Sequence, residues 1–386
     1  MLRFLLLIVA LIVYGSLYPF KFSGQVPTGS QTYDWFVDIY RHTTRSDIIA
    51  NILLFVPYGV VVRMTVNQHK NRVTTALWLL LAGVILAYGL QYAQFFLPAR
   101  VPSAGDAVFN IVGMISGVIF AHWLMQYSHN HMPTGHNIQS SWSQVSLPLL
   151  LALIWICWRW FPFVPLVSAQ SIVNSLNPLL TAPELNFMII LRDGIGWLLF
   201  FYLISQPPFD KQPRFRVLKI ATVILSVELF IINNELTVND LLAALGAFAL
   251  YASIHLSALQ RMLLWGVVLA TILTWLAPFN WHEEGRSMNW MPFASLLRGP
   301  WENTELVLLK LFLTSATVYL FRNRFLDWGL STILCSLLIF LVVQVQRYLG
   351  AIKPDISDVI VVLMVGWAMY QVEKLATDER TLATQN

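Results

Sequence analysis

The chain has 386 residues, of which 57% are hydrophobic and only 11% are charged, with a formal net charge of +4. Such a composition excludes a water-soluble globule, whose surface cannot carry this many apolar residues, and predicts an integral membrane protein. The small positive charge is spread over short loops without a basic stripe, so nucleic-acid binding is not expected.

The apolar runs determine the predicted fold. A membrane-spanning helix needs about 20 mainly apolar residues, because lipid offers the backbone N–H and C=O groups no partner. The chain contains about twelve such runs, so we predict an all-α polytopic membrane protein. In chain order, the helices are expected near residues 2–18, 47–66, 75–96, 106–126, 146–162, 187–205, 217–233, 240–257, 262–278, 305–321, 329–348 and 357–372.

The positions of Lys and Arg in the short loops predict the orientation, since loops retained in the cytoplasm are enriched in these residues. The loops after the second, sixth and tenth predicted helices carry clusters of them: Lys70 and Arg72, Lys211 to Lys219, and Arg322 and Arg324. We therefore place these loops in the cytoplasm. An even number of crossings puts both termini, including the polar tail 374–386, on the same side.

A spacing that recurs three times indicates internal repeats. A polar residue inside an apolar run precedes an aspartate by twelve positions in each case: Gln94 and Asp106 (106 − 94 = 12), Glu228 and Asp240 (240 − 228 = 12), and Gln346 and Asp358 (358 − 346 = 12). Each copy opens with an apolar run that stops at a Pro-Phe pair. The pattern predicts three units of four helices, at residues 1–127, 145–258 and 261–373.

The polar residues of the first unit are expected to meet near the outer leaflet. Asp47 and Asn51 share one helix face, as do Asp106 and Asn110, because the members of each pair are four residues apart. Small residues at Gly113 and Gly117 continue the second stripe and would let another helix approach closely. The predicted pocket is lined by Asp47, Asn51, Gln91, Gln94, Arg100, Asp106 and Asn110. Its counterparts in the other units are Glu228, Asp240, Gln346, Lys353 and Asp358.

These motifs resemble the signature of the VanZ-like family of bacterial membrane proteins. The resemblance rests on the run Asn51-Ile-Leu-Leu-Phe55-Val-Pro57-Tyr-Gly59, on Gln91 and Gln94, and on Arg100-x-Pro102-Ser103-x-x-Asp106-x-x-x-Asn110-x-x-Gly113-x-x-x-Gly117. It is best over residues 1–127 and weaker in the third unit, at Asn289-Trp-Met-Pro292-Phe293 and Lys353-Pro354-Asp355-x-x-Asp358. The family takes its name from a protein linked to resistance to teicoplanin, so the resemblance implies a role in the cell envelope.

Two interpretations of the aspartates remain open. Ser103, Thr237 and Asp355 each stand three residues before one of them, which is the spacing of a capping box. Capping does not explain the polar residues within the apolar runs, since polar groups at membrane depth are costly and often functional. We expect their partner to be the aspartate twelve residues on or, in the first unit, Arg100. Asp47 and Asn51 are likewise open to either a helix-start or a pocket role.

Other polar and aromatic residues are given structural interpretations. Lys310, and Arg192 with Asp193, are expected to pair locally or to extend toward the membrane surface. Trp275 is interpreted as an interface anchor, together with Trp281, Trp290 and Trp301. The histidines from His122 to His136 are irregularly spaced and both cysteines lie in apolar runs, so no metal site or cofactor is expected.

Three classes of function remain compatible with the sequence. In the first, the pocket of unit one binds the polar head of a lipid-linked envelope precursor or a lipid-bearing glycopeptide, and Arg100 pairs with phosphate or carboxylate. In the second, the protein is a transporter or flippase, as twelve helices and internal repeats would allow. In the third, Asp106 and Asp47 act as the acid and base of an intramembrane enzyme. No nucleophile motif or phosphate loop supports catalysis, so a non-enzymatic role is favoured.

Overall fold

A computed structural model describes most of the chain. The described residues are 2–18, 20–23, 28–29, 33, 35, 45–69, 71–98, 100–131, 147–164, 168–181, 184–206, 214–232, 234–293, 300–324, 327–350 and 353–385. Of the predicted features, His136 and the loop around it lie outside these residues.

The described part of the chain is built from α-helices. They are α1 (Leu2–Leu17), α3 (Arg45–Gln68), α4 (Arg72–Gln94), α5 (Ala104–His131), α6 (Leu147–Arg159), α7 (Ala169–Thr181), α8 (Phe187–Leu203), α9 (Arg214–Glu228), α10 (Val238–Ser253), α11 (Leu256–Leu276), α13 (Pro300–Arg324), α14 (Trp328–Gln346) and α15 (Ser357–Gln385). A helix lies over every predicted segment, and α15 continues through the predicted polar tail. The prediction of an all-helical protein is therefore confirmed for the described residues.

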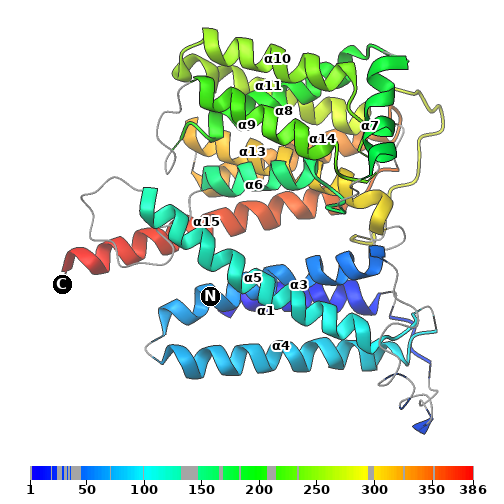
Figure 1. Cartoon of the computed structure of the whole chain (residues 1–386), viewed down its shortest axis with the longest axis vertical. Helices are drawn as coiled ribbons and strands as arrows, with labels where there is room; N and C mark the ends of the chain where they lie inside the picture. The colour runs from blue at the N-terminus through cyan, green and yellow to red at the C-terminus, as the bar shows by residue number, and fades with distance from the viewer. Residues whose placement is uncertain are drawn as a thin grey trace. The chain divides into compact units, whose positions relative to one another are not determined.

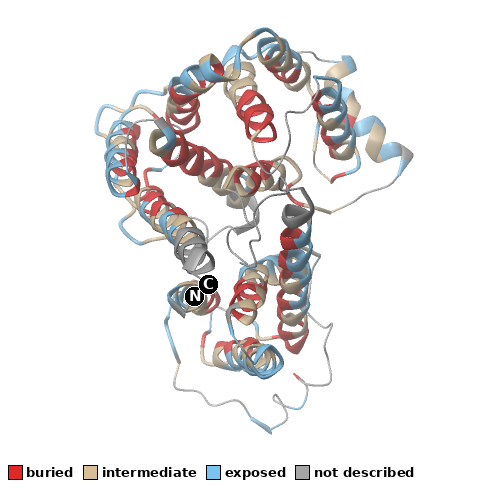
Figure 2. Cartoon of the chain, turned by 90° about the vertical axis from the view of Figure 1, so that its left-hand side faces the viewer, coloured by how far each residue is buried: buried red, intermediate tan, exposed pale blue. Residues whose placement is uncertain are grey.

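Six of the described helices are long and apolar enough to cross a membrane. They are Asp47–Asn67, Arg72–Gln94, Ala104–Gln126, Leu256–Leu276, Thr304–Asn323 and Trp328–Gln346. The outward faces of such helices are also apolar: on α4, Leu77, Trp78 and Ile85 expose 64%, 67% and 64% of their surface. Buried residues lie on the faces that turn toward neighbouring helices (Figure 2). Apolar residues both inside and outside are typical of a helical membrane protein.

Helix α7 is the one described helix that hydropathy does not predict. It has 13 residues, and Gln170, Ser171 and Asn174 lie along it. It crosses near the ends of its neighbours, whereas the longer helices around it lie side by side (Figure 1). A short polar helix of this kind has no apolar run from which it can be recognised.

The chain forms two compact bodies. The N-terminal body is mainly Met1–Asn130 and contains α1, α3, α4 and α5, whereas the C-terminal body is mainly Ser146–Asp378 and contains the remaining helices. The predicted boundary between the second and third units falls inside the C-terminal body. There α6 packs against α8 and α13, and α11 packs against α8, α13 and α14. The helices of these two predicted units therefore share one core.

Close backbone contact joins α3 and α5 in the N-terminal body. A Cβ atom at Gly113 would lie 2.1 Å from the carbonyl oxygen of Ile52, and one at Gly117 would lie 2.1 Å from that of Val56. These distances confirm that the small residues let another helix approach. The contacts advance by four residues on both helices, so α3 and α5 run parallel and begin at the same end of the body.

The three Pro-Phe pairs have the same local geometry. Phe20, Phe163 and Phe279 have φ angles of 60°, 62° and 64°, a left-handed conformation that is unfavourable for an L-residue. The N–H group of each donates a hydrogen bond to the carbonyl oxygen three residues earlier, at 2.9, 2.7 and 2.8 Å respectively. The helices before these pairs therefore end in the same way.

In two of the copies, the residues that follow the Pro-Phe pair also make the same backbone hydrogen bond. The N–H group of Ser23 donates to the carbonyl oxygen of Phe96 at 2.6 Å, and that of His282 donates to Tyr348 at 2.8 Å. Both donors stand four residues after the proline, and both acceptors stand two residues after Gln94 or Gln346 (23 − 19 = 4, 282 − 278 = 4, 96 − 94 = 2, 348 − 346 = 2). The first and last copies therefore share a contact that sequence comparison alone does not predict.

Candidate functional site

The starts of α3 and α5 bring four predicted site residues together: Asp47 and Asn51 from α3, and Asp106 and Asn110 from α5. We call them the α3/α5 cluster. Asn51 Nδ2 donates to the carbonyl oxygen of Asp47 at 2.9 Å. The Asn51 side chain also lies near the Asp106 carboxylate, and the Asp47 carboxylate lies close enough to repel it. Two carboxylates and two amides thus meet where the parallel helices begin.

Two acceptor atoms of the α3/α5 cluster are buried without a partner. Within the described residues, neither Asp106 Oδ1 nor Asn110 Oδ1 has a hydrogen-bond partner. The Asn110 side chain belongs to a residue that is only 1% exposed, whereas Asp47 lies at the exposed end of the cluster. Leaving a buried polar atom unsatisfied costs about 1–3 kcal/mol, so native structures seldom do so without a reason. The cluster therefore has unused capacity to accept hydrogen bonds.

The other predicted site residues of the first unit bind the backbone. Gln91 Oε1 accepts a hydrogen bond from the Ser103 N–H group at 3.2 Å, and Gln94 Nε2 donates to the carbonyl oxygen of Ser16 at 3.1 Å. The expectation that Gln94 pairs with Asp106 or Arg100 is therefore wrong. The reason is that the end of α1 presents carbonyl groups that lack a partner within the helix, and Gln94 lies beside them.

Arg100 binds the same end of α1. Its Nη2 donates to the carbonyl oxygen of Gly15 at 3.2 Å, and its Nε donates to that of Tyr18 at 3.3 Å. A cation is favoured at a helix C-terminus by the helix dipole. Burial lowers the pKa of Arg100, which nevertheless stays charged because an arginine pKa lies far above neutral. In the structure Arg100 thus stabilises a helix end.

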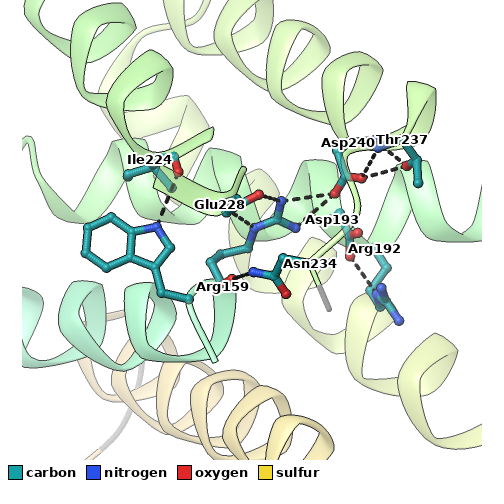
Figure 3. Close-up of polar contacts among 9 residues, drawn as sticks. Arg159, Arg192, Asp193, Ile224, Glu228, Asn234, Thr237 and Asp240 are labelled. Carbon is teal, nitrogen blue, oxygen red and sulfur yellow. Dashed lines mark hydrogen bonds and ion pairs between the residues drawn. The ribbon is translucent and has the colours of Figure 1, made fainter. Parts of the chain in front are cut away.

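In the second copy, Arg159 at the end of α6 lies between two carboxylates (Figure 3). Its Nε and Nη2 donate to Glu228 Oε1 and Oε2 at 2.8 and 2.6 Å. Its Nη1 and Nη2 both donate to Asp240 Oδ1 at 3.0 Å. The expectation that Glu228 pairs with Asp240 is wrong, because two carboxylates this close need a cation between them.

Arg159 is the main residue that the sequence interpretation missed. The available signal was its position, since it is the last residue of an apolar run and stands three residues before Pro162 (162 − 159 = 3). A charge at membrane depth calls for a partner, and Glu228 supplies it. Two other predictions for this region are confirmed. Thr237 and Asp240 form a capping box, and Arg192 Nε pairs locally with Asp193 Oδ1 at 2.6 Å (Figure 3).

In the third copy, Asp358 binds a lysine and a tryptophan. Lys310 Nζ lies 2.9 and 2.7 Å from the two carboxylate oxygens, and Trp275 Nε1 donates to Oδ2 at 2.7 Å. Trp275 is 0% exposed, so its interpretation as an interface anchor is wrong. The expected partnership of Gln346 with Asp358 is also wrong: among the described residues, neither side-chain polar atom of the buried Gln346 has a partner. Lys310 pairs across the core and not locally.

The two family-like motifs of the third unit contact each other. Asn289 Nδ2 donates to Asp355 Oδ2 at 3.0 Å, and the Phe293 N–H group donates to Ser357 Oγ at 2.6 Å. Asp355 Oδ1 accepts from the Ser357 N–H group at 2.8 Å at the start of α15. Lys353, which was predicted to belong to the site, is exposed.

Two cavities lined by described residues lie in the C-terminal body. A cavity of about 290 Å³ lies between α9 and α10 and is lined mainly by apolar residues such as Leu225, Leu241 and Phe248. No group of three or more His, Cys, Asp or Glu side chains in the described part of the chain is arranged to hold a metal ion. The candidate site therefore rests on unpaired acceptors and not on a cavity.

Comparison with known proteins places the α3/α5 cluster inside a recognised family region. Residues 1–125 match the family model described as VanZ/LLP1. No curated protein and no solved structure matches the chain. The matched residues include every member of the cluster.

Proposed function

Because residues 1–125 belong to the VanZ-like family, we propose that this protein binds the polar head of an envelope molecule at the α3/α5 cluster. The ligand class is a lipid-linked envelope precursor or a lipid-bearing glycopeptide, and its binding influences antibiotic resistance or polysaccharide assembly. The observation that carries the proposal is the pair of buried acceptors, Asp106 Oδ1 and Asn110 Oδ1, left without a partner among the described residues. Gln346 in the third unit is also unpartnered, but there Asp358 is bound by Lys310, whereas Asp106 has no ion pair among the described residues.

The proposal includes a topology of twelve crossings in three four-helix units, with both termini in the cytoplasm of a bacterial cell and the cluster near the outer leaflet of its inner membrane. Support comes from the common left-handed conformation of Phe20, Phe163 and Phe279 and from the recurring twelve-residue spacing. The three units are proposed to have different roles, with the ligand bound by the first. Asp240 and Asp358 already have Arg159 and Lys310 as partners, so the second and third units act as scaffold.

Catalysis has one observation in its favour, the proximity of Asp47 and Asp106, which an acid–base pair would need. Transport would draw on the same cluster but require the units to move relative to one another. Binding alone accounts for the unpaired acceptors without requiring a chemical reaction or a movement of the units. Turnover or substrate movement that is lost with Asp106→Asn would favour these alternatives.

A complementation assay tests the proposed binding role. A strain lacking the protein is complemented with the wild type, Asp106→Asn or the exposed-loop control Glu283→Gln, and susceptibility to envelope-directed antibiotics is measured. We expect Asp106→Asn to resemble the deletion strain and Glu283→Gln to resemble the wild type. Arg100→Ala should instead lower the amount of folded protein, because Arg100 binds the end of α1. Unchanged susceptibility with Asp106→Asn, at wild-type protein levels, contradicts the proposal.

A further inference from the structure

We propose that the α3/α5 cluster receives a primary ammonium group of the ligand. The inference rests on the proposed binding function and specifies the chemistry of the bound head. Its basis is a comparison of the three aspartates that recur at the same spacing in the chain.

Two of these aspartates have a cation supplied by the protein. Asp240 is bound by the Arg159 guanidinium at 3.0 Å, and Asp358 is bound by the Lys310 ammonium at 2.7 Å. All four side chains are largely buried, with exposures of 9 to 13%. A buried carboxylate needs such a partner, because desolvation of an isolated charge is expensive.

The positions that supply these cations are uncharged in the N-terminal body. Lys310 lies 32 residues after Pro278 (310 − 278 = 32), and Asn51 lies 32 residues after Pro19 (51 − 19 = 32). Arg159 stands three residues before Pro162 (162 − 159 = 3), where the first copy has Ser16 (19 − 16 = 3). Asp106 thus has an amide where Asp358 has an ammonium group.

The arginines of the N-terminal body with described partners are bound elsewhere. Arg100 donates to the carbonyl oxygens of Gly15 and Tyr18. Arg63, on α3, lies against Asn67 and His122. No ion pair to Asp106 is found among the described residues. No cation therefore reaches Asp106 from the described residues, and the ammonium group of the ligand takes this role.

Asn110 provides an independent indication. It is 1% exposed, its Oδ1 has no partner among the described residues, and it lies one helical turn beyond Asp106 on the face that packs against α3. The two unpartnered atoms are both acceptors. An ammonium group offers three donors and no acceptor, which matches this set. A phosphate or carboxylate would be repelled here, so any anionic part of the ligand must lie away from the cluster.

The Lys310–Asp358 pair suggests a direct test, in which the first unit receives its own ammonium group. Full-length wild-type protein, Asn51→Lys and Asp106→Asn are purified in detergent, and their melting temperatures are measured with n-butylammonium chloride. Sodium chloride and n-butanol at equal concentration are the controls. We expect butylammonium to raise the wild-type melting temperature by about 2 °C or more. Butylammonium should not change the melting temperature of either variant. In Asn51→Lys the new lysine ammonium group occupies the site, and in Asp106→Asn the carboxylate charge is lost.

Equal shifts in all three proteins, or no shift in the wild type, overturn the inference. Asp106→Asn keeps the test valid if Asn51→Lys does not fold. The two proposals can fail separately. If Asp106→Asn loses resistance but butylammonium does not shift the melting temperature of the wild type, the proposed binding function still holds. The inference that the ligand carries an ammonium group is then wrong.

Reconstitution in nanodiscs distinguishes two sources of the amine. Phosphatidylethanolamine carries a primary ammonium group, whereas phosphatidylcholine carries a quaternary group without N–H donors. Stabilisation by phosphatidylethanolamine over phosphatidylcholine that disappears in Asp106→Asn identifies a lipid headgroup. A butylammonium shift without this lipid effect identifies the amine of a sugar or peptide. Absence of the butylammonium shift in the wild type contradicts the proposal whatever the lipid result.

Discussion

At the scale of single residues, the polar interior of the C-terminal body depends on two buried cations. Arg159 satisfies Glu228 through two parallel hydrogen bonds and also binds Asp240. Paired geometry of this kind is stronger than a single contact, because the planar guanidinium matches the carboxylate. Removing the cation leaves two carboxylates buried and unpaired, which costs more than the ion pair itself contributes.

We therefore expect Arg159→Met to destabilise the protein by about 3–5 kcal/mol. Arg322→Met is the control: Arg322 and its partner Glu373 are 35% and 40% exposed, so the loss of their ion pair should cost about 1 kcal/mol or less. Denaturant unfolding of the full-length protein in detergent measures both. A loss for Arg159→Met no larger than that for Arg322→Met would show that the ion cluster is not needed for stability.

Lys310 and Asp358 give a second prediction at this scale. Lys310→Met should destabilise the protein by about 3–5 kcal/mol, because it leaves the Asp358 carboxylate buried without its cation. The double variant Lys310→Met with Asp358→Asn should recover a substantial part of this loss, since no charge is then buried alone. Thermal unfolding of both variants provides the comparison. Additive losses in the double variant would mean that the two residues are not coupled.

At the scale of elements, the approach of α3 to α5 positions the candidate site. Gly113 and Gly117 allow two parallel helices to touch through their backbones, and this contact brings Asn51 beside Asp106. The spacing of the glycines predicted the approach, because only the absence of a Cβ lets helices pack so closely. The glycine spacing did not identify α3 as the neighbouring helix, since any helix with a suitable face could pack against these glycines.

Gly117→Ala should separate the two helices, because its Cβ would lie 2.1 Å from the carbonyl oxygen of Val56. We expect a loss of about 1–3 kcal/mol from overpacking. Gly89 on α4 is the matched control, as nothing lies within 4 Å of the corresponding position. Gly89→Ala should stabilise α4 by up to about 1 kcal/mol, since alanine favours the helix more than glycine. Equal effects of the two substitutions on the melting temperature would contradict the proposed contact.

At the scale of the whole molecule, the chain divides into a four-helix N-terminal body and a larger C-terminal body. The proposed topology predicts the side of the membrane on which each loop lies. Asn71 belongs to a loop predicted to be cytoplasmic, whereas Glu284 belongs to one predicted to be outside. Both residues are exposed in the structure.

Labelling in intact cells checks this topology. Asn71→Cys and Glu284→Cys are introduced into a variant without Cys157 and Cys335, and a membrane-impermeant maleimide is added before and after permeabilisation. We expect Glu284→Cys to react in intact cells and Asn71→Cys to react only after permeabilisation. Reaction of both residues in intact cells would require a different number of crossings between them.

The sequence by itself determined the helical membrane class and the position of a helix over every predicted segment, because lipid forces each crossing to be apolar and to satisfy its own backbone. It also identified the VanZ-like N-terminal region and the close approach made by Gly113 and Gly117. Only the tertiary structure decided which polar groups pair. Arg159, Trp275 and Lys310 are far in sequence from the carboxylates they bind, and neither hydropathy nor residue spacing predicts such long-range contacts. The same contacts separate Gln91, Gln94 and Arg100, which bind backbone groups, from the α3/α5 cluster, two of whose acceptors have no partner among the described residues.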